Sequence, residues 1–396
     1  MCSSDLLNQI FKEADQIKDE LILHRRYLHK NPEVGFDTHN TEKYITEFLN
    51  SQKIEIIPSN IGVMGMIKCS GNSDIIALRA DMDALNLTEE NKVKYKSQNI
   101  GKMHACGHDG HTSMLMGAAK ILNNNRGKLK HNILLIFQPA EEGPNLGGAR
   151  IMLKDLEKKG LISKIKCIYG QHITTEYEVG KIPVKYGSLT ASTDEFTINI
   201  IGKGGHAGIP QEAIDAISVA SKFICEMESF MSRKIDPFDP AVFSVGMING
   251  GTAKNIIAAE AEISGTIRCQ SEANRKYILE NVEKILKGIS LYSGASYKLD
   301  ILHGLPVLVS DAKVMDTVKN IAVEVVGEDN VIDKEKAGMG AEDFAYFAQK
   351  IPAAFIWIGA RNKKKDFVNL MHSPKFDFDE DVLPMGVKML CGFAMQ

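Results

Sequence analysis

The sequence lacks several features that would direct it to particular functions. No apolar run reaches the roughly 18 residues of a membrane-spanning helix, and there is no internal repeat or low-complexity tract. The formal net charge is -3 and no basic stripe carries interleaved aromatic residues, which argues against nucleic-acid binding. Residues 1–20 mix acidic with basic side chains and do not resemble a secretory signal. We therefore expect a cytoplasmic protein that binds neither nucleic acid nor a membrane.

The cysteines do not form the pattern of a disulfide framework. Their number, seven, is odd, their positions are scattered, and most lie in apolar segments. Buried, reduced thiols are expected from such a pattern. Cys106 is the exception, because it lies in a short polar stretch that contains two glycines. The cysteines are Cys2, Cys69, Cys106, Cys167, Cys225, Cys269 and Cys391.

Continuous apolar runs are the clearest structural signal in the chain. The runs 74–80, 131–138 and 165–170 are typical of strands buried on both faces, and helical patterns such as 109–124 lie between them. This alternation predicts an α/β domain with the three strands in one sheet. A length of 396 residues is too great for one ordinary core and predicts at least two domains.

The pattern changes near residue 187 and changes back after residue 303. Residues 187–303 carry predicted strands and helices in the order β-α-β-β-α-β, which is typical of a ferredoxin-like α+β domain. An α/β pattern then returns, with a buried strand at 353–358. The sequence therefore predicts a discontinuous α/β domain, residues 1–186 and 304–396, with a second domain inserted at 187–303.

Polar side chains follow each of the three buried strands at the point where it is predicted to end. Open α/β sheets place their active sites at this edge, so we expect these side chains to converge near Cys106 and His108. Cys106 and His108 are two positions apart and point to the same side of an extended segment, which suits the start of a transition-metal site. The polar residues are Asp81, Glu141, Glu142 and His172.

Two further features complete a possible metal centre. With Cys106, His108 and Glu142, the histidines His172 and His372 make five candidate ligands. Five exceed the needs of one tetrahedral zinc and suit two ions about 3.5–4 Å apart, with a bridging thiolate. Glu141 would stay free as a general base toward water. The plainer alternatives are structural histidines and an acidic, solvated helix start.

The inserted domain also carries candidate functional residues. His206 lies in a glycine-rich loop and could donate a hydrogen bond to a developing oxyanion, unless the loop is an ordinary turn. Asn255 and Arg268 could bind a substrate carboxylate, with the arginine as a bidentate clamp. On its alternating strand, Arg268 could equally be a surface residue.

Taken together, these motifs resemble those of the M20 metallopeptidase superfamily. The resemblance is to its amidohydrolase branch, which holds the aminoacylase, hippurate hydrolase and auxin-conjugate hydrolases. The motifs occur in the family's order over most of the chain. They are residues 79–85, 104–111, 137–142, 204–210, 250–255, 265–268 and 340–344, and His372 with Pro374.

This resemblance implies a fold, a reaction and a set of roles. The fold would be a mixed-sheet, helix-flanked α/β metallohydrolase domain with an inserted ferredoxin-like lid or dimerisation domain. The reaction would be hydrolysis of N-acyl amino acids with two divalent ions (zinc, manganese or cobalt), in a homodimer or higher homo-oligomer. The implied roles are metal ligands at Cys106, His108, Glu142, His172 and His372, a base and proton shuttle at Glu141, stabilisation of the tetrahedral intermediate by His206, and carboxylate binding by Asn255 and Arg268.

Three departures from the family pattern leave other activities open. Asn86, Gln171 and Ala258 replace residues more usual in the branch, and they bear on acyl-group and amino-acid preference rather than on the ligands. A metallo-di- or tripeptidase could use the same site. A cysteine hydrolase with Cys106 as nucleophile would leave the Glu141–Glu142 pair unexplained. Glu141 also argues against a non-catalytic binding protein.

Overall fold

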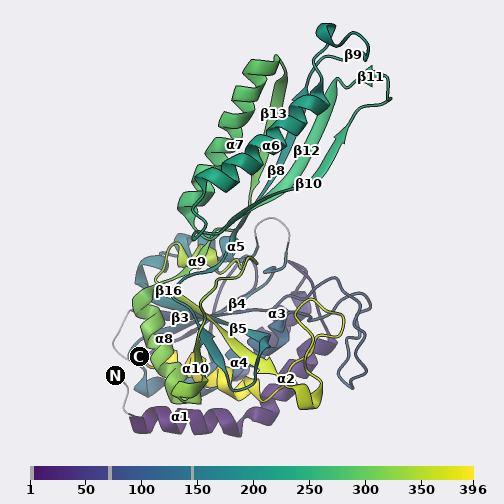
Figure 1. Cartoon of the computed structure of the whole chain (residues 1–396). Helices are drawn as coiled ribbons and strands as arrows, with labels where there is room; N and C mark the ends of the chain where they lie inside the picture. Colours follow the sequence, from purple (N-terminus) through teal and green to yellow (C-terminus); the bar gives the residue numbers. More distant parts are fainter. Residues whose placement is uncertain (1–3, 70–73, 144–146) are drawn as a thin grey trace. The chain divides into compact units, whose positions relative to one another are not determined.

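The computed structural model describes residues 4–69, 74–143 and 147–396, which form two compact units (Figure 1). Unit 1 comprises Met1–Gly187, Val309–Lys336 and Asp343–Gln396, and unit 2 comprises Ser188–Leu308 and Ala337–Glu342. Within the described ranges, no helix has the length and apolar character needed to cross a membrane. The cytoplasmic location stays a prediction.

A mixed sheet of six strands forms the centre of unit 1. Its order is β1-β2-β4-β3-β5-β16, in which β4, β3, β5 and β16 run parallel while β2 and β1 each pair antiparallel. The predicted α/β fold class is therefore confirmed. The strands are β1 (Glu55–Ile57), β2 (Val63–Ile67), β3 (Ile75–Asp81), β4 (Asn132–Gln138), β5 (Ile165–Glu178) and β16 (Ala353–Arg361).

Helices α1, α2, α4 and α10 pack against one another and share a hydrophobic core with the sheet. Leu78 and Leu135 enter this core from the sheet, and Met114 and Leu390 enter it from the helices. The helices of unit 1 are α1 (Ser4–Gln16), α2 (Lys18–Lys30), α3 (His39–Ser51), α4 (His108–Asn124), α5 (Ala149–Lys158), α8 (Ala312–Val326), α9 (Ala345–Ala348) and α10 (Val382–Ala394), and two short strands, β6 (Ile182–Val184) and β15 (Val331–Asp333), pair in parallel.

The third buried strand is longer than the apolar run predicted. β5 continues to Glu178 because β16 pairs with it that far, whereas β3 pairs with it only as far as Gly170. His172 therefore lies inside a strand, opposite Trp357, rather than beyond the end of one. It still lies two residues beyond Gly170, the last residue of β5 that pairs with β3, at the edge of the sheet where the other polar side chains meet.

The cysteines lie in more varied environments than the sequence predicts. The six described cysteines are free thiols, and Cys2 lies outside the described residues. Cys106, Cys269 and Cys391 are buried, but Cys225 on α6 (Ala216–Lys234) is exposed, because its side chain faces away from the core of unit 2. The prediction of a buried thiol is wrong for that residue.

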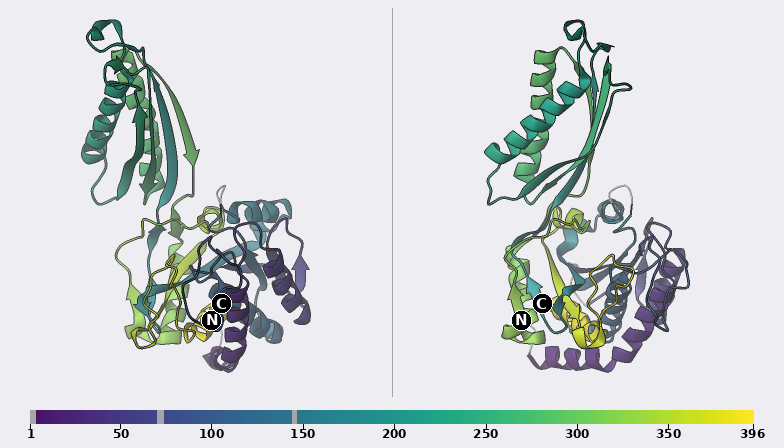
Figure 2. Two further views of the ribbon diagram at one scale, coloured as in Figure 1. Left: turned by 90° about the vertical axis from the view of Figure 1, so that its right-hand side faces the viewer. Right: turned by 45° about the vertical axis from the view of Figure 1, so that its right-hand side comes forward.

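Unit 2 contains a four-stranded antiparallel sheet with two helices on one face (Figure 2). Its order, β10-β12-β8-β13, is the ferredoxin-like arrangement predicted. The strand predicted at 256–268 is divided, since β11 leaves the sheet to pair with β9. The elements are β8 (Ser192–Ile201), β9 (Gly205–His206), α6, β10 (Ala241–Gly250), β11 (Ile256–Ile257), β12 (Glu260–Cys269), α7 (Glu272–Ser293) and β13 (Ser296–His303), with β7 (Gly187–Thr190) and β14 (Leu308–Ser310) at the boundaries of the units.

Candidate metal centre

The five side chains predicted as ligands come together in unit 1. The described residues include three overlapping groups of potential ligands, and within each group the ligand atoms all lie within 4.8 Å of one another. They draw on the loop before α4, the first residue of α4, the segment after β4, the strand β5 and the loop before α10. The groups are Cys106, His108 and His172; Cys106, Glu142 and His372; and His108, Glu141 and Glu142.

One end of this cluster is buried. The Cys106 Sγ atom lies 3.4 Å from His172 Nε2. His172 Nδ1 donates a hydrogen bond to the Ile173 carbonyl at 2.6 Å, which leaves a lone pair on Nε2. Burial lowers the pKa of His172 well below its ordinary value, so the ring is neutral. Both ring nitrogens of His108 are buried without a hydrogen-bond partner among the described residues.

The other end of the cluster opens toward solvent. Glu142 Oε1 lies 2.7 Å from His372 Nε2, and the side chain of His372 is 55% exposed. The backbone N–H of His372 donates to the carbonyl of Ala105, next to Cys106, at 2.8 Å. His372 and Ala140, which precedes Glu141, have φ values of 65° and 56°. This left-handed conformation is strained in both residues and is often found at functional sites.

Asp83 fixes the direction of the two glutamates. One carboxylate oxygen of Asp83 accepts the backbone N–H of Glu141 at 3.0 Å, and the other accepts that of Glu142 at 3.1 Å. The same carboxylate lies 3.5 Å from His108 Nδ1. The sequence reasoning gave Asp83 no role. Its position, two residues past Asp81 at the end of a buried strand, was the available signal.

His111 lies within the candidate metal centre, but both of its ring nitrogens contact neighbouring protein groups. Its Nδ1 lies 2.6 Å from Asp81 Oδ1, and its Nε2 accepts the backbone N–H of Ile173 at 2.8 Å. Both nitrogens are therefore engaged, although Asp81, His108 and His111 also form a group of metal-ligand type. By holding Ile173, His111 fixes the backbone beside His172.

Asp109 lies in the first turn of α4 but does not cap this helix. Gly107, at φ 87°, is the N-cap residue and makes no side-chain cap. The Asp109 carboxylate instead accepts a hydrogen bond from Arg25 Nε at 2.8 Å and lies 2.8 Å from His29 Nδ1. His104 is buried with both nitrogens unpaired among the described residues, and burial lowers its pKa to about 3.

The electrostatics of the centre suit divalent cations. Burial lowers the pKa of His108, but Asp81, Asp83 and Glu142 outweigh this and raise it to about 10. Burial and the nearby carboxylates also raise the pKa of the Cys106 thiol. Because the cluster favours a proton on the buried His108 imidazole, it carries an excess of negative charge. Its sulfur, nitrogen and oxygen donors fit zinc, manganese or cobalt. Reactive cysteines lie in electropositive surroundings, whereas Cys106 lies beside the carboxylates of Glu142 and Asp81, which argues against a role as catalytic nucleophile.

The remaining predicted residues lie in unit 2. His206 is exposed on β9, where its Nδ1 accepts the backbone N–H of Gly208 at 2.9 Å. His206 and Asn255 both line a pocket of about 500 Å³. Arg268 lies on β12 between Val242 and Thr193 of the neighbouring strands and does not line this pocket.

A Cys, His and Glu cluster at the edge of a mixed α/β sheet is typical of a metal-dependent hydrolase. The profile of peptidase family M20/M25/M40 matches residues 77–396, and the chain belongs to this family. The resemblance inferred from the motifs is thereby confirmed, and the family match adds that the class acts on amide bonds.

Three similar proteins place the chain more closely within the family. Thermostable carboxypeptidase 2 of Saccharolobus solfataricus is 36% identical, over 96% of this chain and 96% of its own length. N-acetylcysteine deacetylase of Bacillus subtilis is 36% identical, over 95% and 96% of the two chains. The structure of the YXEP protein of Bacillus subtilis, described as a dinuclear metal binding peptidase from the M20 family, matches with a TM-score of 0.82 at 32% identity, over 96% of this chain and 98% of its own.

Proposed function

We propose that this protein hydrolyses the amide bond of N-acyl amino acids of N-acetyl or N-benzoyl type and releases a carboxylic acid and a free amino acid. The observation that carries the proposal is the pairing of Glu141 with Glu142 through Asp83. Glu142 is directed to His372, while Glu141 stands beside it in the group with His108. This arrangement supports a role for Glu142 in binding a cation and a role for Glu141 in moving a proton.

The reaction divides among the proposed residues as follows. Cys106, His108, Glu142, His172 and His372 would hold two divalent ions, which would supply a Lewis acid for the scissile carbonyl and would lower the pKa of water toward roughly 7. Glu141 takes a proton from the attacking water and passes it to the leaving amine as the C–N bond breaks. His206 donates a hydrogen bond to the developing oxyanion. Asn255 and Arg268 bind the amino-acid carboxylate.

Apolar side chains beside the centre favour an acyl group over a charged amine. Met371 Sδ lies 4.0 Å from Cys106 Sγ, and the Trp357 ring centre lies 4.8 Å from that of His172. A free peptide α-amine would need an acidic partner in place of such a surface. The relative named as a deacetylase supports the same choice, and the relative named as a carboxypeptidase keeps di- and tripeptides as the second candidate class.

A substrate panel tests the proposal. The metal-free protein would be loaded separately with zinc, manganese and cobalt and assayed on N-acetyl and N-benzoyl amino acids and on dipeptides. We expect a higher kcat/KM for N-acyl amino acids, loss of activity with a chelator and recovery with added metal. A higher kcat/KM for dipeptides would identify a peptidase instead. Activity that survives full removal of metal would contradict the metal-dependent mechanism.

We also propose that the protein is a homodimer formed through unit 2. β10 is an edge strand of the described sheet and pairs with β12 alone. Val242, Met247 and Ile248 on this strand are exposed apolar side chains, a combination suited to pairing with a second copy. Light scattering coupled to size-exclusion chromatography should give twice the monomer mass. Ile248→Lys places a charge on the edge strand and should lower the measured mass toward that of the monomer. A monomeric mass for the unaltered protein would refute this part of the proposal.

A further inference from the structure

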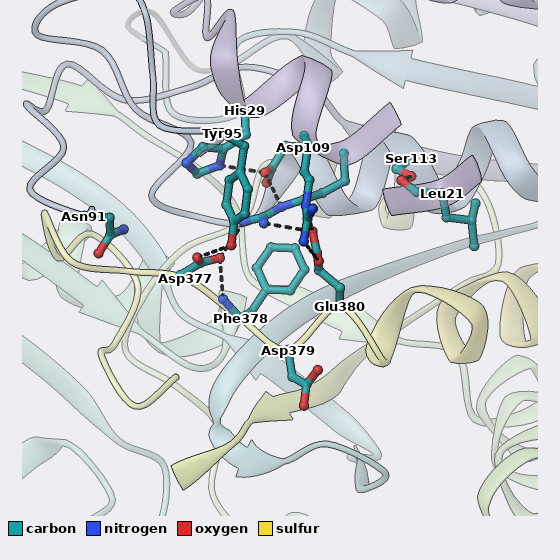
Figure 3. A network of polar contacts seen from close by, with 12 residues as sticks. Leu21, His29, Asn91, Tyr95, Asp109, Ser113, Asp377, Phe378, Asp379 and Glu380 are labelled. Atoms are coloured by element: carbon teal, nitrogen blue, oxygen red, sulfur yellow. Dashed lines mark hydrogen bonds and ion pairs between the residues drawn. The ribbon is translucent and has the colours of Figure 1, made fainter. Parts of the chain in front are cut away.

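A largely buried polar cluster that includes Asp109, Asp377 and Glu380 joins two segments that lead to the candidate metal centre (Figure 3). Arg25 donates hydrogen bonds to all three carboxylates. Arg25, on α2, is fully buried. Its Nε donates to Asp109 Oδ2 at 2.8 Å, its Nη2 to Asp377 Oδ1 at 2.6 Å, and its Nη1 to Glu380 Oε1 at 3.2 Å. Only a guanidinium has planar donors that can reach three carboxylates in three directions at once.

The three carboxylates lie in segments that also carry proposed metal ligands. Asp109 directly follows His108 at the start of α4. Asp377 and Glu380 lie in the segment that connects His372 to α10. One side chain of α2 therefore holds the segments that carry two of the five proposed ligands, and it touches neither ligand itself.

Other contacts reinforce this arrangement from the same direction. His29, one turn further along α2, lies 2.8 Å from Asp109 Oδ2, and Tyr95 donates its hydroxyl to Asp377 Oδ2 at 2.7 Å. Ser113 donates to the backbone carbonyl of Leu21 at 2.7 Å. α2 thus holds α4 at two successive turns.

Stability alone does not account for such a cluster. Taking an arginine and its carboxylate partners out of water is costly, and well-packed apolar residues of similar volume often serve stability equally well or better. What the charged cluster provides is a fixed geometry, because each hydrogen bond sets a distance and a direction between two segments.

We propose that Arg25 is a positioning residue for the metal centre, which fixes the His108 end of α4 relative to the segment that follows His372. This rests on the proposed function for its effect on turnover but not for its effect on metal binding. Loss of the Arg25 guanidinium should let the start of α4 and the segment after His372 shift relative to each other. Both metal affinity and kcat should then fall, while KM changes little.

The test compares Arg25→Lys with the matched control Arg26→Lys. Arg26 is the next residue, and its guanidinium donates to Glu380 from a side chain that is 44% exposed, without a bond to Asp109 or Asp377. Metal dissociation constants would be measured by chelator competition on metal-free proteins, together with kcat, KM and thermal melting. We expect a rise in the metal dissociation constant of roughly 10- to 100-fold for Arg25→Lys, and a change within about twofold for Arg26→Lys.

Two outcomes would overturn the proposal. One is a folded Arg25→Lys protein with the metal affinity and kcat of the unaltered protein. The other is a lower melting temperature of the metal-free variant with unchanged metal affinity, which a purely structural role predicts.

If Arg25→Lys does not fold, Tyr95→Phe tests the proposal instead, because this substitution removes only the hydroxyl that donates to Asp377. We expect a severalfold loss of metal affinity in that variant, and an unchanged affinity would refute the proposal. If the unaltered protein binds metal but hydrolyses no N-acyl amino acid, the proposed function fails while the metal readout still decides the role of Arg25.

Discussion

The two units hold their candidate functional residues in opposite ways. In unit 1, His172 is fixed by the hydrogen bond that its Nδ1 donates to the carbonyl of the next residue, and Glu142 is fixed by its backbone N–H, which donates to Asp83. In unit 2, His206 and Asn255 are exposed and line an open pocket. A metal centre needs preset distances between its ligands, whereas a residue that meets a substrate can be ordered when the substrate arrives. The contrast therefore predicts that substitutions in unit 1 alter metal binding and that those in unit 2 alter turnover alone.

The largest effect should come from the one residue of unit 1 that we propose acts on the substrate rather than on the metal. Glu141→Gln removes the base but keeps the backbone bond to Asp83, so kcat should fall by roughly a hundredfold to ten-thousandfold. Metal content, measured by elemental analysis, should stay unchanged. Glu142→Gln is the matched control and should lose metal. If Glu141→Gln loses metal instead, the two glutamates have exchanged roles.

In unit 2, His206→Ala should lower kcat by roughly 10²–10³-fold, the usual cost of one oxyanion donor. The melting temperature and the metal content should not change, because the side chain is exposed and belongs to a separate unit. His303→Ala, at another exposed histidine of unit 2, serves as the control in the same kinetic assay. An unaltered kcat for His206→Ala would remove His206 from the mechanism.

A smaller effect is expected when the buried thiol is replaced. Cys106→Ser exchanges a soft ligand for a hard one and should weaken metal binding by roughly tenfold or more. The number of ions retained after dialysis against a chelator measures this. Cys225→Ser, at an exposed thiol of unit 2, should leave it unchanged. Full two-ion content in Cys106→Ser would rule out a bridging thiolate.

The smallest effect concerns the pH dependence of stability in unit 1. Burial and Arg25 lower the pKa of His29, but hydrogen bonds to Asp109 and Glu89 outweigh them and raise it to about 9. An unfolded histidine titrates near 6.5, so between these values the native protein binds more protons. The contribution of His29 to the free energy of unfolding should be fully present below about pH 6.5 and should be lost as the pH rises through 9, and it amounts to on the order of 3 kcal/mol at most.

Denaturant unfolding of the metal-free protein from about pH 6 to about pH 9.5 measures this slope. His29→Gln should reduce this slope by the contribution of His29, while His108, whose pKa is also raised, should keep the remainder. His39→Gln, at an exposed histidine of the same unit, should retain the full slope. A slope in His29→Gln equal to that of the unaltered protein would mean that another group is responsible.

The parts of the site that the sequence predicts are those that follow from local pattern. Buried apolar runs located β3 and β4, and the polar residues after them fall at one edge of the sheet. The length of β5 was missed because its second half pairs, among the described strands, with β16 alone and is not a continuous apolar run. The Arg25 cluster was missed for the same reason: Arg25 and Asp377 are 352 residues apart, and two adjacent arginines in a helix pattern are typical of a surface.

The single tryptophan of the chain gives the protein an intrinsic optical reporter. Trp357 lies across from His172 in the neighbouring strand, with the two ring centres 4.8 Å apart. Indole emission responds to charge and to paramagnetic ions at such short range, so loading the centre should change the fluorescence of the whole protein through one side chain. Cobalt or manganese should quench it and zinc should shift it. Occupancy could then be followed in real time, without a label or a substrate.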